Sequence, residues 1–524
     1  MYEEGVSSYA DQEYVVKVIA HELAHMWFGD IVTCDWWTDL WLNEGFASWV
    51  ENLGVEHWLP ESGKRDREVF THNNASKCFC VIVKLCTKII YDGYLLRMFL
   101  EHRVAALAVD GLDTTKAISA DVTNPYYTKT SSTIVYDKGA CLLLMIEGFL
   151  SFETFVKGVN QYLKNNVYST AMRYDLWQAL DAAALEDGIS LGGYDMGTIM
   201  ESWSLQKGYP IVNVKMGDEG TQLILTQERY FLDPSLGSAQ EQWYIPINYA
   251  LAGGDFETIP PPSLWLGPNS SSVIEFPSDG TSTPFVLNVQ SKAYFRVNYP
   301  ADNWIGLTDA LVTNPDSIHK LNRAAVVDDA MSLARSGKLD YSTALGVTTY
   351  LGTEAEYIPF KAGVDSFEHL EIMLRSTEED HVALRDYVIS LLGNLYSELV
   401  SFEVASGDPM QDILFQIELI EWMCMYGYAD CVNNANQRFG EWMDSGTNDI
   451  APDLKQSVYK VAIREGSVTE FDFLLEKLLT VGVANEVNKI IYGLGNSRNV
   501  HLTNVGTPNV STYQVVIFLI HNNS

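Results

Sequence analysis

The chain is poor in positive charge: 34 Lys and Arg residues stand against 68 Asp and Glu residues, for a net charge of −34. A surface of that sign repels phosphate groups, so the composition argues against nucleic-acid binding. It would attract cationic peptides, but acidic surfaces more often serve solubility, and we favour that interpretation. The 47% hydrophobic and 19% charged fractions are those of a globular protein, and 524 residues predict two to four domains.

Long apolar runs are also missing. No stretch of eighteen uncharged apolar residues occurs, which argues against an encoded transmembrane helix. The first residues, Met1 to Glu4, have neither the basic start nor the apolar run of a signal peptide. We therefore expect no export signal and no membrane anchor within this sequence.

Cysteine is scarce as well, and seven cysteines in a chain of this length do not make a disulfide scaffold. Cys424 and Cys431 are close enough to close a short loop, but they could equally be two reduced thiols. The spacing alone does not separate these alternatives. Asn269-Ser270-Ser271 is a candidate glycosylation acceptor.

What the chain does contain is His21-Glu22-Leu23-Ala24-His25, followed by Glu44 with eighteen residues between it and His25. One helical turn, about 6 Å along the axis, brings His21 and His25 to one face. Both imidazoles can then bind one metal ion, and Glu44 is the natural third ligand. Two histidines and one glutamate leave a fourth position for water, which is the pattern of a catalytic zinc site.

The alternative interpretation is an exposed helix with two solvated histidines. Against it, the motif lies between apolar stretches at 15–19 and 26–28 that predict a buried helix, where unpaired imidazoles would be costly. Three aspartates are candidate hydrogen-bond partners for the ligand imidazoles: Asp30, Asp35 and Asp39. The sequence does not choose among these three, and each could instead cap a helix.

Two segments then carry a specific resemblance. His21-Glu-Leu-Ala-His-Met-Trp-Phe-Gly-Asp30 and Trp41-Leu-Asn-Glu-Gly-Phe-Ala47 resemble the zinc aminopeptidases of the aminopeptidase N and aminopeptidase A type. The resemblance implies that His21, His25 and Glu44 bind one zinc ion per chain and that Glu22 is the general base. It also implies an oxidising compartment, because ectodomain members have a disulfide in the segment of Cys424 and Cys431.

A third segment, Tyr136-Asp137-Lys138-Gly139-Ala140, matches the place where the family has its transition-state tyrosine. A tyrosine hydroxyl can donate a hydrogen bond to the oxyanion that forms when water attacks an amide. On sequence alone Tyr136 would be a packing residue, and only the resemblance implies the catalytic role. The family usually has a Phe-Asp pair just upstream, where this chain reads Thr-Ser-Ser-Thr-Ile-Val at 130–135.

The pattern along the chain predicts a multidomain α+β protein. Residues 1–206 resemble the C-terminal, helical part of a thermolysin-like catalytic domain, in which 62–94 has no family counterpart and is a predicted insertion. Gly208 and Pro210 mark a boundary, and the period-two runs of 207–299 predict a small β-sandwich. The pattern of residues 300–500 predicts an incomplete helical domain, a HEAT- or armadillo-like superhelix. Residues 501–524 are expected to be an atypical tail.

The predicted activity is hydrolysis of the N-terminal peptide bond of peptides by zinc-activated water, with Glu22 as the base. In the family, recognition of the free amine depends on a Gly-Ala-Met-Glu-Asn motif and a Gln before the zinc helix. Only twenty residues precede His21, and neither feature is among them. We therefore expect the sequence to be a fragment of a longer aminopeptidase. Two alternatives remain open: an inactive truncated chain that serves as an interaction protein, and a zinc endopeptidase.

The expected partners are peptide substrates and not nucleic acids, and the resemblance allows a homodimer. It implies a location at the cell surface, with membrane association only through segments outside this sequence. The absence of a signal and an anchor in the sequence itself leaves a cytoplasmic location open.

Overall fold

The computed structural model describes residues 3, 6–58, 97–124, 132–217, 221–236, 239–275, 283–405 and 407–499. The predicted insertion at 62–94 and the predicted tail at 501–524 lie outside these residues. The chain divides into two compact units. Of the described residues, those up to Val16 and those from His369 onward form the smaller unit, and those from Lys17 to Glu368 form the larger unit.

Helices dominate the first part of the larger unit, and two of them carry the zinc motif: α1 (Tyr9–Ala24), which begins in the smaller unit, and α2 (Trp41–Trp58). The further elements, in chain order, are β1 (Val32–Cys34), η1 (Trp37–Asp39), η2 (Met98–Val104), α5 (Ala105–Asp110), η4 (Ile134–Lys138), α6 (Gly139–Leu150), α7 (Phe152–Asn165), β2 (Ser169–Ala171), α8 (Arg173–Glu186) and α9 (Met196–Ser204).

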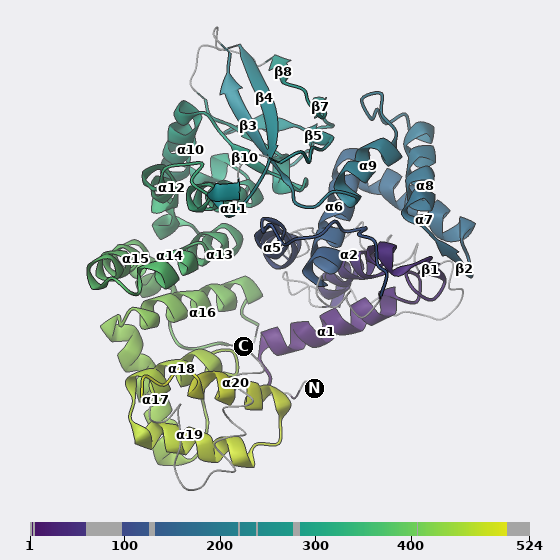
Figure 1. The fold of residues 1–524 in the computed structure, drawn as a ribbon. Coiled ribbons are helices and arrows are strands. Elements are labelled where there is room, and N and C mark those ends of the chain that lie inside the picture. The colour runs from purple at the N-terminus through teal and green to yellow at the C-terminus, as the bar shows by residue number, and fades with distance from the viewer. Residues whose placement is uncertain are drawn as a thin grey trace. The chain divides into compact units, whose positions relative to one another are not determined.

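The core of this part forms around α6, in which every residue except Gly148 is buried. A helix that is apolar on all sides is stable only when other elements surround it. α2 packs against α6, and α7 packs against α8 (Figure 1). Fully buried tryptophans fill the spaces around these helices: Trp41, Trp49, Trp177 and Trp203. The short strands β1 and β2 pair in parallel, so the segment after α1 is joined to the segment before α8.

Strands follow directly after Gly208. One sheet has the order β10-β3-β4-β8, formed by β3 (Pro210–Met216), β4 (Gln222–Arg229), β8 (Ser272–Glu275) and β10 (Arg296–Asn298). β3 and β4 are antiparallel, while β10 lies parallel to β3 (Figure 1). Two further pairs are antiparallel: β5 (Ile245–Ile247) with β7 (Leu264–Leu266), and β6 (Tyr249–Leu251) with β9 (Phe285–Leu287). Strands thus occur within the region of period-two runs, but β7 and β8 lie outside the individual runs, and the arrangement as a sandwich stays a prediction.

The described residues after Pro300 are mostly helical. The larger unit continues with α10 (Ala301–Thr313), α11 (Lys320–Arg335), α12 (Tyr341–Thr348) and α13 (Tyr357–Asp365), and α14 (Phe367–Leu374) spans the boundary between the units. The smaller unit contains α15 (Glu378–Leu399), α16 (Met410–Met425), α17 (Ala429–Ser445), α18 (Lys455–Glu465), α19 (Val468–Thr480) and α20 (Ala484–Leu494).

Within the smaller unit a disulfide joins Cys424, in α16, to Cys431, in α17. The structure thereby resolves the alternative that the sequence left open, in favour of the bridged pair. The start of α1 belongs to the same unit: the backbone N–H of Tyr9 donates to Asp453 at 2.6 Å, and Asp11 pairs with Lys489 at 2.9 Å. Among the described residues, no helix combines the length and the apolar character needed to span a bilayer.

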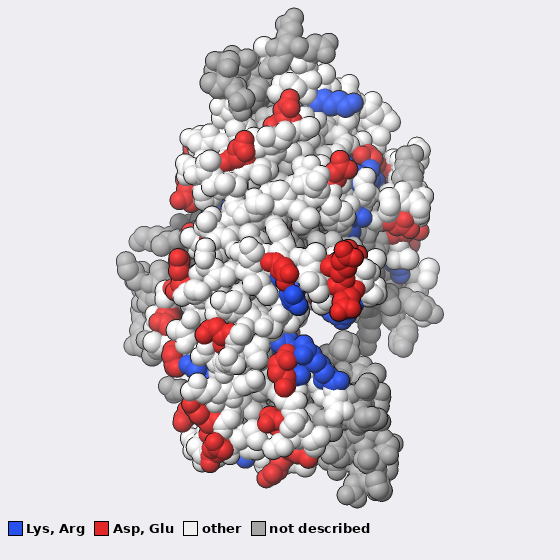
Figure 2. Space-filling model, turned by 90° about the vertical axis from the view of Figure 1, so that its left-hand side faces the viewer, with Lys and Arg blue, Asp and Glu red and all other residues white. Residues whose placement is uncertain are grey.

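Acidic side chains are dispersed over the face of the molecule in Figure 2 and do not gather in a single patch. Local concentration of one charge is what would steer a ligand of opposite sign. The dispersion on this face therefore favours the solubilising interpretation of the net charge of −34.

Candidate metal centre

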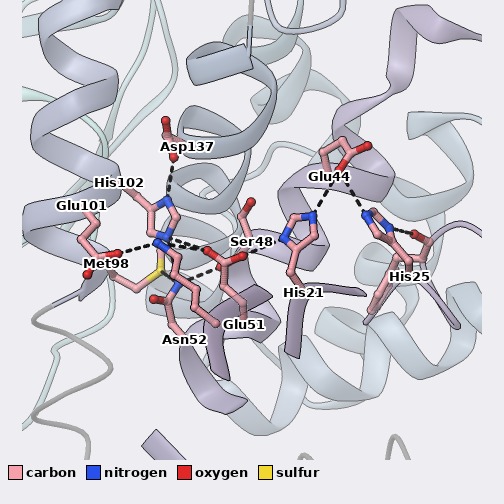
Figure 3. A network of polar contacts seen from close by, with 12 residues as sticks. His21, His25, Glu44, Ser48, Glu51, Asn52, Met98, Glu101, His102 and Asp137 are labelled. Carbon is pink, nitrogen blue, oxygen red and sulfur yellow. Dashed lines mark hydrogen bonds and ion pairs between the residues drawn. The ribbon is translucent and has the colours of Figure 1, made fainter. Parts of the chain in front are cut away.

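α1 and α2 bring together three side chains that the sequence places in two separate segments. The potential ligand atoms of His21, His25 and Glu44 all lie within 4.8 Å of one another. Glu44 Oε2 is 3.4 Å from His21 Nε2 and 3.2 Å from His25 Nε2, and Figure 3 shows this carboxylate between the two imidazoles. The two rings meet edge to face, with centroids 4.8 Å apart. One ion could contact all three groups.

The second nitrogen of each ring has its own partner. His21 Nδ1 lies 2.7 Å from Glu51 Oε2, and His25 Nδ1 lies 3.0 Å from the backbone carbonyl of Phe28. Since a carboxylate and a carbonyl only accept hydrogen bonds, both Nδ1 atoms must carry the proton. When each imidazole is neutral, its Nε2 therefore has the lone pair and faces Glu44, which is the tautomer that a metal ligand requires.

The donor set fits a metal ion for a further reason. Glu44 Oε2 is buried and forms no hydrogen bond within the described part of the chain. A buried oxygen in this position costs free energy unless some other group satisfies it. Two imidazole nitrogens and one carboxylate oxygen form a set that suits zinc, with room for a fourth ligand.

The charges at the cluster reinforce one another when no metal is bound. Burial lowers the pKa of His21, but the carboxylates of Glu44 and Glu51 outweigh burial and raise it to about 9. Burial raises the pKa of Glu44, but the two imidazoles outweigh it and lower the pKa to about 2. A proton thus occupies the place that a cation would take, and the two must compete.

The partners of the ligand imidazoles are not the three aspartates that the sequence offered. Asp39 accepts hydrogen bonds from Ser119 at 2.7 Å and from Arg173 at 3.2 Å, and Asp35 accepts one from Thr170 at 2.8 Å. Glu51 takes that place at His21. The sequence could have predicted this partner, because Glu51 follows Glu44 by seven residues, which is two turns along the same face of α2.

Tyr136 lies beside the cluster, in the π-helical turn η4. Its ring stacks on His21 at 5.8 Å between centroids, with only 8° between the planes. Burial, together with the charge of Glu44, raises the pKa of Tyr136 above its usual value, so the hydroxyl keeps its proton. A protonated hydroxyl next to the candidate ligands can act as a hydrogen-bond donor.

The residues that follow Tyr136 hold this turn in place. Asp137 bonds to His102 at 2.8 Å, and the fully buried Lys138 bonds to Asp110 at 2.8 Å and to the carbonyl of Gly208 at 3.0 Å. A Cβ atom added to Gly139 would lie 3.0 Å from the Cα of Gly45, the residue after Glu44. Only glycine permits so close an approach of α6 to α2.

The expectation that α1 is a buried helix is wrong for the described residues. Ala24 is its only buried residue. Glu22 is exposed, and the apolar side chains of Val18, Ile19 and Leu23 are 39%, 54% and 51% exposed. The physical reason is that the described residues leave these apolar side chains of α1 uncovered. An apolar sequence shows that a face favours a partner, but it does not show that the same chain supplies it.

Comparison with known proteins assigns the family. Residues 1–203 match the peptidase family M1 domain, and residues 284–505 match the ERAP1-like C-terminal domain. The chain belongs to peptidase family M1. The resemblance inferred from the sequence motifs is therefore confirmed at the level of the family.

Named relatives of this M1 chain agree with the family models. Aminopeptidase Ey of Gallus gallus is 32% identical over 502 residues, which cover 94% of this chain and 47% of the relative. Membrane alanyl aminopeptidase of Manduca sexta is 30% identical over 95% of this chain and 47% of the relative. Aminopeptidase N of Oryctolagus cuniculus is 30% identical over 96% of this chain and 50% of the relative. The chain spans about half the length of the curated relatives it matches.

Proposed function

We propose that the protein containing this M1 chain is a zinc-dependent aminopeptidase that hydrolyses the N-terminal peptide bond of peptides. The observation that carries the proposal is the convergence of His21 Nε2, His25 Nε2 and a buried, unsatisfied Glu44 oxygen beside a protonated tyrosine. We assign one zinc ion per chain to these three residues. When bound there, zinc polarises a scissile carbonyl and lowers the pKa of a water molecule.

The chain's own residues supply the remaining chemistry. Glu22 accepts a proton from the attacking water and passes it to the leaving amine, as a carboxylate that does not bind the metal can do. Its exposure on α1 leaves it accessible to substrate. The Tyr136 hydroxyl donates a hydrogen bond to the carbonyl oxygen as negative charge develops on it. The catalytic residues of this proposal are therefore Glu22 and Tyr136.

We further propose the domain plan that the sequence predicts: the catalytic part in 1–206, a β-sandwich in 207–299 and a helical superhelix in 300–500. The paired strands after Gly208 and the succession of helices after Pro300 support it. Peptides are the proposed substrates. The Manduca sexta relative is a membrane alanyl aminopeptidase by name, which supports a location at a membrane surface, and the family resemblance allows a homodimer.

The test begins with the purified chain, its zinc content and its turnover of an aminoacyl-amide reporter. We expect one zinc ion per chain. Glu22→Gln should keep the zinc and abolish any turnover, because the amide cannot accept the proton. Asp30→Asn, which changes another exposed acidic residue near the motif, is the matched control and should change neither property.

Other outcomes distinguish the alternatives. A wild-type chain without zinc would refute the proposal, and turnover that survives in Glu22→Gln would remove Glu22 from the role of base. Zinc binding without turnover would favour an interaction protein. Cleavage of an N-acetylated peptide at an internal bond would favour an endopeptidase, because no free amine is then available for recognition.

A further inference from the structure

Glu51 is a buried carboxylate of α2 that the proposed reaction does not use. Its side chain is 6% exposed, and both of its oxygens are engaged. Oε2 accepts the hydrogen bond from His21 at 2.7 Å, while Oε1 lies 3.4 Å from the ammonium group of Lys17. Lys17 and His21 are one turn apart on α1, so both can face the same carboxylate. A buried carboxylate needs such a cationic partner to remain charged.

Behind Glu51 lies a second buried group, His102 of η2, which is 2% exposed. Its Nδ1 is 2.8 Å from Asp137, which accepts a hydrogen bond from it, and its Nε2 is 2.9 Å from the amide nitrogen of Asn52. The same amide also donates to the carbonyl of Ser48 at 2.7 Å. The Nε2 atom of His102 also lies 3.6 Å from Glu51 Oε1.

These contacts join four elements into one connected set, which we term the Glu51 network: Lys17, Glu51, Asn52, His102 and Asp137. Figure 3 labels the last four of these residues. At one end it contacts His21, a proposed zinc ligand. At the other end it contacts Asp137, the residue directly after Tyr136 in η4. A shift of Glu51 or His102 would therefore move both His21 and the turn that carries Tyr136.

We propose that Glu51 is a positioning residue for the metal centre, and that His102, together with Asp137, fixes the position of Glu51 relative to the turn that carries Tyr136. This inference rests on the proposed function, because it concerns how the zinc ligands are presented. A carboxylate that accepts the Nδ1 proton fixes the ring orientation and strengthens Nε2 as a ligand. Lys17 and the His102–Asp137 pair keep that carboxylate in place.

The competing interpretation is that the Glu51 network only joins α1 to α2 and contributes to folding. The two roles differ in what they change. A purely structural role predicts a loss of stability with the zinc affinity of the folded protein preserved. A positioning role predicts weaker zinc binding and an altered ligand geometry in protein that remains folded.

The experiment uses the full chain as wild type, Glu51→Gln and His102→Gln, with Glu101→Gln as the control. Glu101 pairs with Lys17 from the solvent side and its side chain is 39% exposed, so its charge is screened and contributes little. The zinc dissociation constant is measured by competition with a chromogenic chelator. The visible absorption of the Co²⁺-loaded protein reports the geometry of the ligands, and thermal melting of the metal-free protein reports folding.

For Glu51→Gln we expect zinc binding to weaken about 10- to 100-fold and the Co²⁺ bands to shift, as for loss of a ligand-orienting carboxylate. His102→Gln should shift the same bands and weaken zinc binding about 10-fold, at the low end of that range, because His102 acts on the ligand only through Glu51. The control should match the wild type in both measurements. Should Glu51→Gln fail to fold, His102→Gln alone decides the outcome.

Unchanged zinc affinity and unchanged Co²⁺ bands in folded Glu51→Gln and His102→Gln would overturn the inference while leaving the proposed function intact. A lower melting temperature with unchanged zinc affinity would assign the network to folding and would overturn it equally. A wild-type chain that binds no zinc would overturn the proposed function first, and the inference with it.

Discussion

The ion pair between Lys138 and Asp110 offers the sharpest test of how the site is supported. Both side chains are 0% exposed, and their charged atoms are 2.8 Å apart. Lys138 Nζ also donates to the carbonyl of Gly208 at 3.0 Å. The pair joins η4, which carries Tyr136, to the end of α5, and Lys138 also connects η4 to Gly208, two residues before β3. We predict that Lys138→Met strongly destabilises the larger unit.

The size of the effect follows from what the substitution leaves behind. Asp110 Oδ1 keeps its donors, Thr115 at 2.8 Å and the N–H of Gly208 at 3.0 Å. Oδ2 retains only the hydroxyl of Tyr294, at 3.5 Å. A buried carboxylate without its cation costs about 3–5 kcal/mol. The double variant Lys138→Met/Asp110→Asn removes the stranded charge as well, so it should lose less stability than the single variant.

Urea denaturation followed by tryptophan fluorescence measures the free energy of unfolding, since the buried tryptophans of the larger unit report its unfolding. Wild type, Lys138→Met, Asp110→Asn and the double variant form a complete cycle. If Lys138→Met lowers the free energy of unfolding by less than about 1 kcal/mol, the reasoning is refuted, because exposed ion pairs contribute stabilisation of that size. A double variant that is less stable than Lys138→Met alone would refute it as well.

Three further predictions concern the site itself. In the active enzyme, Tyr136→Phe should lower kcat about 10²- to 10³-fold through loss of one oxyanion donor, and steady-state kinetics showing a change in KM alone would mean that Tyr136 only packs. Zinc affinity should rise with pH up to about 9, because the raised pKa values of His21 and His25 mean that protons must leave before the metal binds; chelator competition between pH 6 and 9 would show a flat profile if this is wrong. Gly139→Ala brings its Cβ to 3.0 Å from the Gly45 backbone, so overpacking should cost about 1–3 kcal/mol in urea denaturation, and a neutral result would mean that α2 and α6 separate freely.

Several features of the site could be predicted from local sequence. The spacing of His21 and His25 indicates a shared face because helical geometry is regular, and the structure brings their ligand atoms to Glu44 within 4.8 Å. Strands β3 and β4 were likewise predictable from period-two runs, because side chains alternate regularly along a strand, whereas β7 and β8 were not. The place of Glu51 was also within reach, two turns beyond Glu44 on α2.

Other features depend on contacts between residues far apart in the chain. His102 meets Glu51 and Asp137 only because η2, α2 and η4 pack together, and no local pattern marks a buried imidazole. The disulfide between Cys424 and Cys431 needs the turn between α16 and α17, which the spacing left open.

The sequence by itself determined the residue types and spacings of a metal site, because one helical turn places His21 beside His25 whatever surrounds the helix. It did not determine which faces are covered. The apolar residues of α1 predicted burial, yet Leu23 is 51% exposed, because burial depends on the elements that pack against a helix and not on the helix alone. Only the tertiary structure decided how Glu44, Glu51 and Tyr136 meet around His21.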